Sequence, residues 1–196
     1  MRRRDDGFAG GTLGAEVLGV DIASNLVAAG RQRAIAEGLA NCKFQEGDAS
    51  NLHDLKDRSF DLVVTIFGAM FAPKPFDVAK EMVRVTRPGR RIVMGNWVPH
   101  DPTLVAQILK ISTAHSPPPE GFVSPMTWRI ESNVIERFAA TGVPKENVSF
   151  LKDTYTSTFP GLHRSSLRHL ENIMIRQPRK GQPRRRSAER AGSSVQ

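Results

Sequence analysis

The sequence predicts an α/β protein whose mostly parallel sheet carries helices on both faces and an antiparallel hairpin at one edge. Along residues 15–97, short apolar runs alternate with helical or turn-rich segments. This alternation favours parallel strands joined by right-handed crossovers, which place helices on both faces of the sheet. Further on, residues 148–159 are rich in β-branched and aromatic types, which favours two antiparallel strands.

The first half of the chain contains three predicted strands and one helix. Residues 15–20 (AEVLGV) are an apolar run that ends at Asp21, as expected for a buried parallel strand. A helix follows, with Ser24 as a suitable N-cap and Gly38 as a stop. The next two strands are expected at residues 42–49 (CKFQEGDA) and 60–68 (FDLVVTIFG).

The remaining elements are predicted from the positions of prolines and glycines and from the spacing of apolar residues. Pro73 and Pro75 precede a helix that Pro88-Gly89 ends, and a fourth parallel strand follows. The later elements are expected as a helix at 101–112, an irregular loop at 116–125, a helix at 129–142, strands at 148–153 and 154–159, and a helix at 163–177.

Basic residues gather at one end of the chain. The formal net charge is +8, yet nine of the 28 Lys and Arg and only two of the 20 Asp and Glu lie in residues 162–196. The remainder is almost neutral, so a nucleic-acid or anionic surface is expected to bind only through this end, if at all. We expect one domain over residues 1–160, incomplete at its N-terminus, and a basic disordered tail over residues 161–196.

Residue types exclude several classes of function. No apolar run reaches the roughly 18 residues of a membrane span, and no signal peptide is recognisable, so a cytoplasmic protein without a transmembrane segment is expected. The five histidines share no metal-ligand spacing and Cys42 is the only cysteine, so we expect no metal site and no internal disulfide. No constellation of side chains identifies a catalytic residue.

Two aspartates follow predicted strands. In an open α/β sheet, ligands bind outside the carboxyl ends of the strands. Asp21 lies at the first such end, where its carboxylate can accept both ribose hydroxyls of a nucleoside. Asp48 lies at the carboxyl end of the next strand, where a hydrogen-bond acceptor can bind an adenine amino group. The loop after residues 60–68 adds apolar surface that could shelter the reacting end of a cofactor.

Taken together, these segments resemble the class I S-adenosylmethionine-dependent methyltransferases. The resemblance is to the methyltransferase type 11 group, which is related to the ubiquinone and menaquinone biosynthesis methyltransferases. It covers about residues 14–160 and rests on these segments: GAEVLGVDIASNLV, EGDASNL, FDLVVTIFGAMFAPKP and VRVTRPGRRIVMGNW. It implies a Rossmann-like fold and methyl transfer from S-adenosylmethionine to a small-molecule acceptor.

The resemblance also implies a role for each site residue. Asp21 would bind the ribose hydroxyls of S-adenosylmethionine, and Ile22 would pack on the adenine ring. Asp48 would bind the adenine amino group, with Ala49 beside it. The wall near the methionine portion would be lined by the last two site residues, Phe67 and Gly68.

One part of the family pattern is missing. The family's central first strand ends in an acidic residue and a Gly-x-Gly-x-Gly loop, whereas residues 1–14 (MRRRDDGFAGGTLG) contain glycines but no apolar strand. We expect the strands ending at Asp21 and Asp48 to lose their link to residues 60–68. Three arrangements are then open: another segment fills the slot, the sheet closes by direct pairing, or the chain is a fragment. Poor cofactor binding by this chain alone is expected.

Two other interpretations stand beside a methyltransferase. One is a non-catalytic truncated Rossmann-like remnant or binding module, which failure to bind cofactor would favour. The other is a nucleotide-dependent oxidoreductase, because an acidic residue after a second strand also suits the ribose of NAD. The segments EGDASNL and RPGRRIVMGNW argue against the oxidoreductase.

Overall fold

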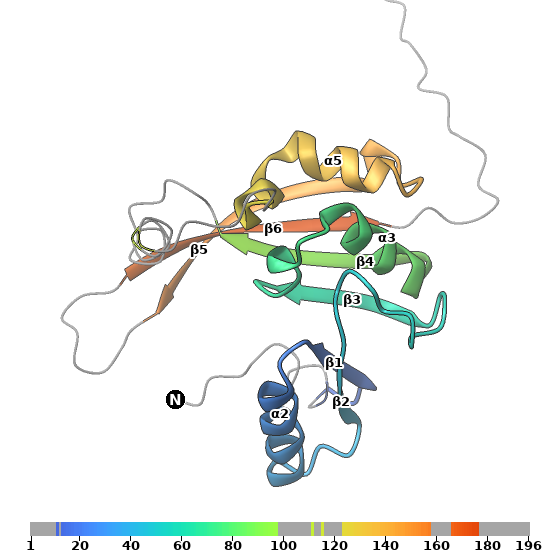
Figure 1. The fold of residues 1–196 in the computed structure, drawn as a ribbon, viewed down its shortest axis with the longest axis vertical. Helices are drawn as coiled ribbons and strands as arrows, with labels where there is room; N and C mark the ends of the chain where they lie inside the picture. The colour runs from blue at the N-terminus through green and yellow to red at the C-terminus, as the bar shows by residue number, and fades with distance from the viewer. Residues whose placement is uncertain are drawn as a thin grey trace, which may run out of the picture.

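The computed structural model describes residues 11, 13–97, 111, 115, 123–157 and 166–176, with only the backbone from residue 153 onward. Figure 1 labels the main helices and strands of this α/β fold. In chain order, the elements are β1 (Val17–Asp21), α2 (Ser24–Ala36), β2 (Cys42–Glu46), β3 (Phe60–Ile66), η1 (Ala69–Phe71), α3 (Pro75–Val85), β4 (Thr86–Trp97), η2 (Pro125–Arg129), α5 (Glu131–Ala139), η3 (Lys145–Asn147), β5 (Val148–Ser157) and β6 (Ser166–Arg176).

The strands form two sheets. In the first sheet, β1 and β2 pair in parallel, with Val17 opposite Cys42 and Asp21 opposite Glu46. The second sheet has the strand order β3-β4-β6-β5, in which β3 and β4 are parallel and the pairs made by β6 are antiparallel. In the described residues no ladder joins β1 to β3, so the sheet is divided where the sequence predicts a missing strand. Figure 1 shows β1, α2 and β2 as a small unit beside the larger sheet.

The small unit is held together by close packing of α2 on its two strands. A Cβ added at Gly19 or Gly30 would lie 2.6 or 2.7 Å from the Phe44 ring, so glycine at both positions lets the ring fit between strand and helix. Arg31 of α2 also donates two hydrogen bonds to the Phe44 carbonyl, over 3.0 and 2.8 Å. The helix is therefore fastened to β2 by both packing and hydrogen bonds.

The core of the larger unit lies between its sheet and the helices α3 and α5. The apolar positions of α3 recur at helical spacing, and Val78, Met82 and Val85 are buried. Val78 and Met82 pack in one cluster with Ile92 and Met94 of β4 and with residues of η2 and α5. Figure 1 shows α3 and α5 side by side on one face of this sheet.

The predicted boundary between the second predicted helix and the fourth parallel strand is wrong. The helix α3 ends at Val85, and β4 begins at Thr86, so Pro88 and Gly89 lie inside the strand rather than before it. The Thr86 hydroxyl donates to the Met82 carbonyl over 2.6 Å and satisfies an acceptor at the helix end. Gly89 takes a φ of +79°, which glycine adopts without strain, and the β3–β4 register shifts nearby.

An antiparallel strand pair lies at the sheet edge as predicted, but only one of its two strands comes from the predicted residues. Residues 148–157 are one continuous strand, β5, rather than two, and the partner strand is β6. The helix predicted over residues 163–177 is wrong, because residues 166–176 form β6 between β4 and β5. Pairing of β6 with β4 on one side and with β5 on the other outweighs the local helical preference of these residues. The sheet thus extends past residue 160, while the predicted helix at 101–112 and residues 177–196 lie largely or wholly outside the described residues.

Candidate functional site

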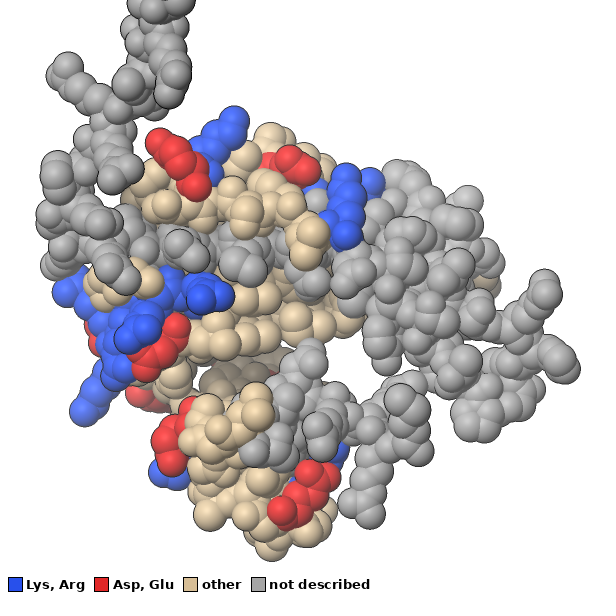
Figure 2. All heavy atoms as spheres, turned by 180° about the vertical axis from the view of Figure 1, so that it is seen from behind, with Lys and Arg blue, Asp and Glu red and all other residues tan. Residues whose placement is uncertain are grey.

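A cleft of about 310 Å³ lies between the two sheets. Its walls come from β1, the segment after β2, β3 and η1, and α3 contributes Met82 and Val85. In Figure 2, which views the molecule from behind, the surface is hollowed between the small unit and the larger one. Ile22 directly after β1, Gly47 directly after β2 and Gly68 two residues after β3 line this cleft, so it lies at the carboxyl ends of these strands, where α/β sheets bind ligands.

The structure brings most of the predicted site residues together. Five of the six line the cleft, from three separate segments of the chain: Asp21, Ile22, Asp48, Ala49 and Gly68. Phe67 does not line the cleft and instead packs partly buried against the core. The juxtaposition of Asp21 and Asp48 follows from the parallel pairing of β1 with β2, which places both strand ends side by side.

Asp21 both ends β1 and supports the start of α2. Its Oδ1 accepts a hydrogen bond from the Ala23 amide over 2.9 Å. Ser24, the predicted N-cap, begins the helix instead, and α2 has no side-chain cap bond. Asp21 is exposed, and Ile22 beside it leaves 76% of its surface accessible to solvent. The carboxylate therefore has one structural hydrogen bond and a position open to a ligand hydroxyl, next to an exposed apolar side chain.

Asp48 occupies a tight turn that only a glycine before it permits. Its Oδ1 accepts a hydrogen bond from the Ser50 amide over 2.8 Å, which fixes the carboxylate at the cleft. A Cβ added at Gly47 would lie 2.7 Å from Cγ1 of Val20, so the segment after β2 approaches β1 more closely than any other residue would allow. The Gly47 amide also donates to the Asp21 carbonyl over 3.0 Å and ties the two strand ends together.

Phe67 turns the chain out of β3 and into η1. Its φ of +58° is unfavourable for a bulky residue and costs about 1–3 kcal/mol. The ring stacks on Trp97 with centroids 3.8 Å apart, and the Phe67 amide donates to the Gly95 carbonyl over 2.9 Å. The Ala69 amide donates to the Thr65 hydroxyl over 2.9 Å in the same turn. These contacts hold the strained backbone and leave Gly68 exposed at the cleft.

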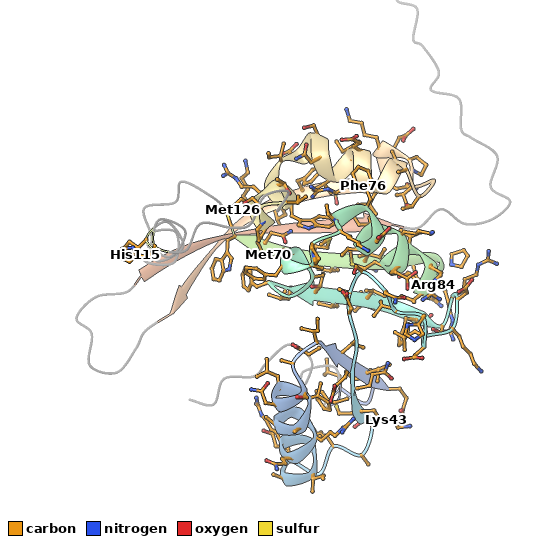
Figure 3. All side chains as sticks on the ribbon, in the orientation of Figure 1. Lys43, Met70, Phe76, Arg84, His115 and Met126 are labelled. Atoms are coloured by element: carbon orange, nitrogen blue, oxygen red, sulfur yellow. The ribbon has the colours of Figure 1, made fainter. Side chains whose placement is uncertain are left out.

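Arg84 fixes the loop that carries one wall of the cleft, a role that sequence reasoning missed. Its guanidinium donates to the carbonyls of Leu52 and Leu55, each over 2.7 Å. It also pairs with Glu81 and Asp57, over 2.7 and 2.6 Å. Figure 3 shows Arg84 at the end of α3, beside the loop that leads into β3. The only signal in the sequence is a Glu and an Arg three residues apart on one helix, which is common on solvated helix faces.

Glu81 shares this arrangement and makes it sensitive to acid. Its Oε2 accepts the Leu52 amide over 2.7 Å, and only 12% of its side chain is exposed. The hydrogen bond from Arg84 lowers the pKa of Glu81, with the Leu52 amide acting in the same direction against burial. A lowered folded-state pKa means that the ionised carboxylate stabilises the fold above its unfolded pKa, and that this contribution is lost as the pH falls through the folded value.

We therefore expect Glu81→Gln to lower the free energy of unfolding by about 2 kcal/mol at pH 7, since hydrogen bonds to charged groups contribute about 1.5–3 kcal/mol. Below the folded pKa of Glu81 the deficit should shrink, because the native carboxyl is then protonated as well. Urea unfolding of both proteins at pH 7 and at a series of acidic pH values measures this difference. A deficit that is the same at every pH would contradict the assignment.

The described residues contain no metal centre. No three His, Cys, Asp or Glu side chains gather closely enough within them to hold a metal ion. No helix among them is both long and apolar enough to cross a membrane. The polar side chains that line the cleft are those of Asp21, Asp48 and Thr65. The two carboxylates accept hydrogen bonds and therefore suit a ligand portion that carries hydroxyl or amino groups, such as a nucleoside.

Comparison with protein families matches residues 8–94 to a methyltransferase domain. Demethylmenaquinone methyltransferase of Geobacillus kaustophilus is 43% identical over 74 residues, which are 38% of this chain and 31% of that protein. An uncharacterized protein of Mycobacterium tuberculosis is 38% identical over 84 residues, or 43% of this chain and 30% of that protein. The chain thus matches about a third of the length of these curated relatives.

Solved structures share the fold over most of the chain. A possible histamine N-methyltransferase from Thermotoga maritima aligns with a TM-score of 0.57 at 17% identity, over 86% of this chain and 76% of that one. Geranyl diphosphate methyltransferase in complex with S-adenosylmethionine aligns with a TM-score of 0.55 at 15% identity, over 87% of this chain and 72% of that one. The TM-scores show a common Rossmann-like fold, and at such low identities the likeness concerns the fold alone.

Proposed function

We propose that this chain is a member of the methyltransferase type 11 group of the class I S-adenosylmethionine-dependent methyltransferases, that it binds S-adenosylmethionine in the cleft between its two sheets, and that it transfers the methyl group to a small-molecule acceptor. The matches to a methyltransferase domain over residues 8–94 and to demethylmenaquinone methyltransferase support this assignment. The observation that carries the proposal is the convergence of Asp21 and Asp48 on one cleft at the carboxyl ends of β1 and β2.

The residues of the cleft fit the nucleoside portion of this cofactor. Asp21 would accept the ribose hydroxyls, and the exposed Ile22 would cover the adenine ring. Asp48, fixed by the Ser50 amide, would accept the adenine amino group, with Ala49 beside it. Gly68 would let the chain approach the methionine portion, because only the Thr65 hydroxyl lies within 4 Å of a Cβ built there. Phe67 would not contact the cofactor itself and would instead hold this turn in place by stacking on Trp97.

Methyl transfer from S-adenosylmethionine requires few catalytic groups from the protein beyond those that bind the cofactor and the acceptor. When bound, S-adenosylmethionine supplies a methyl group on a positively charged sulfur that departs as a neutral thioether. Alignment of an acceptor with that methyl group supplies much of the rate, and a base is needed only for an acceptor that is not already ionised. The proposal therefore assigns binding and positioning to the cleft residues and no proton transfer to any of them.

Calorimetric titration of the folded chain with S-adenosylhomocysteine tests the proposal. The sequence predicts that this chain alone binds the cofactor poorly, and we expect Asp21→Ala to weaken that binding by a further tenfold or so, because hydrogen bonds to a charged group contribute about 1.5–3 kcal/mol. Asp54→Ala, which removes an exposed carboxylate outside the cleft, should bind as the parent does.

Two results would contradict the proposal. Absence of binding by a folded chain would favour a non-catalytic binding module. Binding of NAD in preference to S-adenosylhomocysteine, equally dependent on Asp21, would favour a nucleotide-dependent oxidoreductase.

A further inference from the structure

Basic side chains gather at the amino ends of β3 and β4, whereas the predicted cofactor residues lie at the carboxyl ends. Asp61 of β3 pairs with both Arg87 and Arg90 of β4. The Arg87 Nε also donates to the Arg58 carbonyl over 3.3 Å, and Arg91 directly follows Arg90. In Figure 2, Lys and Arg side chains gather in this part of the larger unit, at the left of the view. We call these four arginines the arginine cluster, and none of them lines the cleft.

The positive charge of the arginine cluster exceeds the negative charge that pairs with it. Arg87 and Arg90 share the single carboxylate of Asp61. Arg58 and Arg91 form no ion pair within the described part of the chain. All four arginines are exposed, Arg87 and Arg90 with 48% and 58% of their side chains accessible to solvent. The cluster therefore presents an excess of positive charge to the solvent, although the chain outside residues 162–196 is almost neutral overall.

The backbone around Arg58 fixes one side of the cluster. Arg58 has a φ of +52°, which is uncommon for a residue other than glycine. Its amide donates to the Arg84 carbonyl over 2.8 Å, and its carbonyl accepts the bond from Arg87. The preceding residue, Asp57, pairs with Arg84 rather than with the cluster. These contacts tie the turn before β3 to the start of β4 and hold the guanidinium groups close together without neutralising them.

A second basic segment of the chain begins beside the cluster. In the ladder between β4 and β6, Arg176 lies opposite Arg91, and it is the last residue of β6. Residues 177–196 follow directly and contain six Lys or Arg and one Glu. Arg-rich segments of this kind are typical of arms that bind nucleic acids. The fold thus brings two groups of basic residues, far apart in the sequence, to one end of the sheet.

We propose that the arginine cluster binds the phosphate backbone of a nucleic acid. Guanidinium groups match the oxygens of a phosphate in pairs, which favours arginine at such surfaces. An anionic membrane fits less well, because residues 56–61 and 84–91 include no large apolar side chain that is exposed, and surface binding to lipid grows with buried apolar area. The inference goes beyond methyl transfer and does not depend on it.

The composition of the cluster also indicates how the nucleic acid is bound. Residues 56–61 (KDRSFD) and 84–91 (RVTRPGRR) contain no Asn or Gln, the amide side chains that bind adenine edges in pairs of hydrogen bonds. Phe60, the aromatic residue of these segments, is half-buried and so offers little surface for stacking on a base. Contacts should therefore be made with phosphates, with little preference for base sequence and a strong dependence on salt.

Fluorescence anisotropy of a fluorescein-labelled oligouridylate, titrated with the full chain at several salt concentrations, tests the proposal. The parent should bind, and more weakly as salt rises. The double variant Arg58→Gln, Arg91→Gln removes two guanidinium groups and keeps both ion pairs of Asp61. It should bind about tenfold more weakly at low salt, and the slope of log K against log salt should fall by about 1.4, because each phosphate contact with a single strand contributes about 0.7.

Two controls separate charge at the cluster from other effects. Lys74→Gln removes an exposed cation just before α3, at the opposite end of that helix from Arg84, and should bind as the parent does. The double variant Arg58→Lys, Arg91→Lys keeps both charges and should recover most of the affinity and the full salt slope. Circular dichroism checks that each variant is folded.

Three results would overturn the proposal. One is no binding of the oligouridylate by the folded parent chain. Another is unchanged binding by Arg58→Gln, Arg91→Gln together with lost binding when Arg184, Arg185 and Arg186 are replaced by Gln, which would assign the nucleic acid to the residues after β6 alone. The third is binding to phosphatidylglycerol vesicles but not to the oligouridylate, which would assign the cluster to a membrane surface.

Discussion

Replacement of Arg84 by methionine is expected to lower the free energy of unfolding by about 3 kcal/mol, in the range found when one partner of a largely buried ion pair is removed. The substitution leaves the Glu81 carboxylate, only 12% exposed, without its cation. It also leaves the carbonyls of Leu52 and Leu55 without their donor. Methionine preserves most of the aliphatic stem, so the loss reports on hydrogen bonding rather than on packing. Urea unfolding followed by circular dichroism measures it.

Arg87→Met is the matched control for this prediction. Arg87 also pairs with an aspartate, Asp61, but the two side chains are 48% and 53% exposed. Exposed ion pairs contribute about 0–1 kcal/mol, so this variant should remain close to the parent in stability. Equal losses in the two variants would show that Arg84 makes no more than a surface contact. A larger loss in Arg84→Met alone would identify it as the residue that holds the loop beside the cleft.

The parts of the fold that the sequence predicts well are those whose pattern is local. The apolar runs that became β1, β2 and β3 are short, end at turn residues and need no knowledge of their neighbours. Asp21 and Asp48 were predicted to lie together for a similar reason, since parallel strands bring their carboxyl ends to one edge of a sheet. For the link between β1 and β3 the sequence left three arrangements open, and among the described residues the two sheets stay separate.

The predictions that were wrong or lacking concern residues whose structure depends on contacts with residues far away in the sequence. Residues 166–176 form a strand because β4 and β5 lie on either side of them, and nothing in their own spacing indicates those neighbours. The end of α3 was misplaced because a Pro-Gly pair usually stops a helix, whereas Thr86 already ends it and the pair lies within β4. The positive φ of Phe67 was unpredictable because a stack on Trp97, thirty residues away, supports it.

The second large effect is expected in the core of the larger unit. Trp128→Ala should lower the free energy of unfolding by about 3–5 kcal/mol, as found for large aromatic residues in well-packed interiors. Trp128 is 1% exposed and lies against Phe138, with ring centroids 6.4 Å apart. It belongs to the cluster that includes Ile92, Met94 and Val134, so its removal opens a cavity between η2, α5 and β4. Since whole domains are stable by about 5–15 kcal/mol, this variant is expected to be close to unfolding.

Trp128 is expected to stabilise the fold through its contact with Arg137 as well as through the volume that it fills. Its guanidinium lies 4.5 Å from the centroid of the indole ring, and burial lowers the pKa of Arg137. Its Nη2 donates to the Thr127 hydroxyl over 2.8 Å, whereas its Nη1 is buried without a partner among the described residues. The aromatic face therefore supplies part of the stabilisation that this buried cation lacks in hydrogen bonds. Trp128→Phe keeps an aromatic face and much of the volume, so it should recover well over half of the loss in urea unfolding. If Trp128→Phe were as unstable as Trp128→Ala, the contact between Arg137 and an aromatic ring would not account for the stability that Trp128 provides. The close packing of the larger indole ring would then account for it.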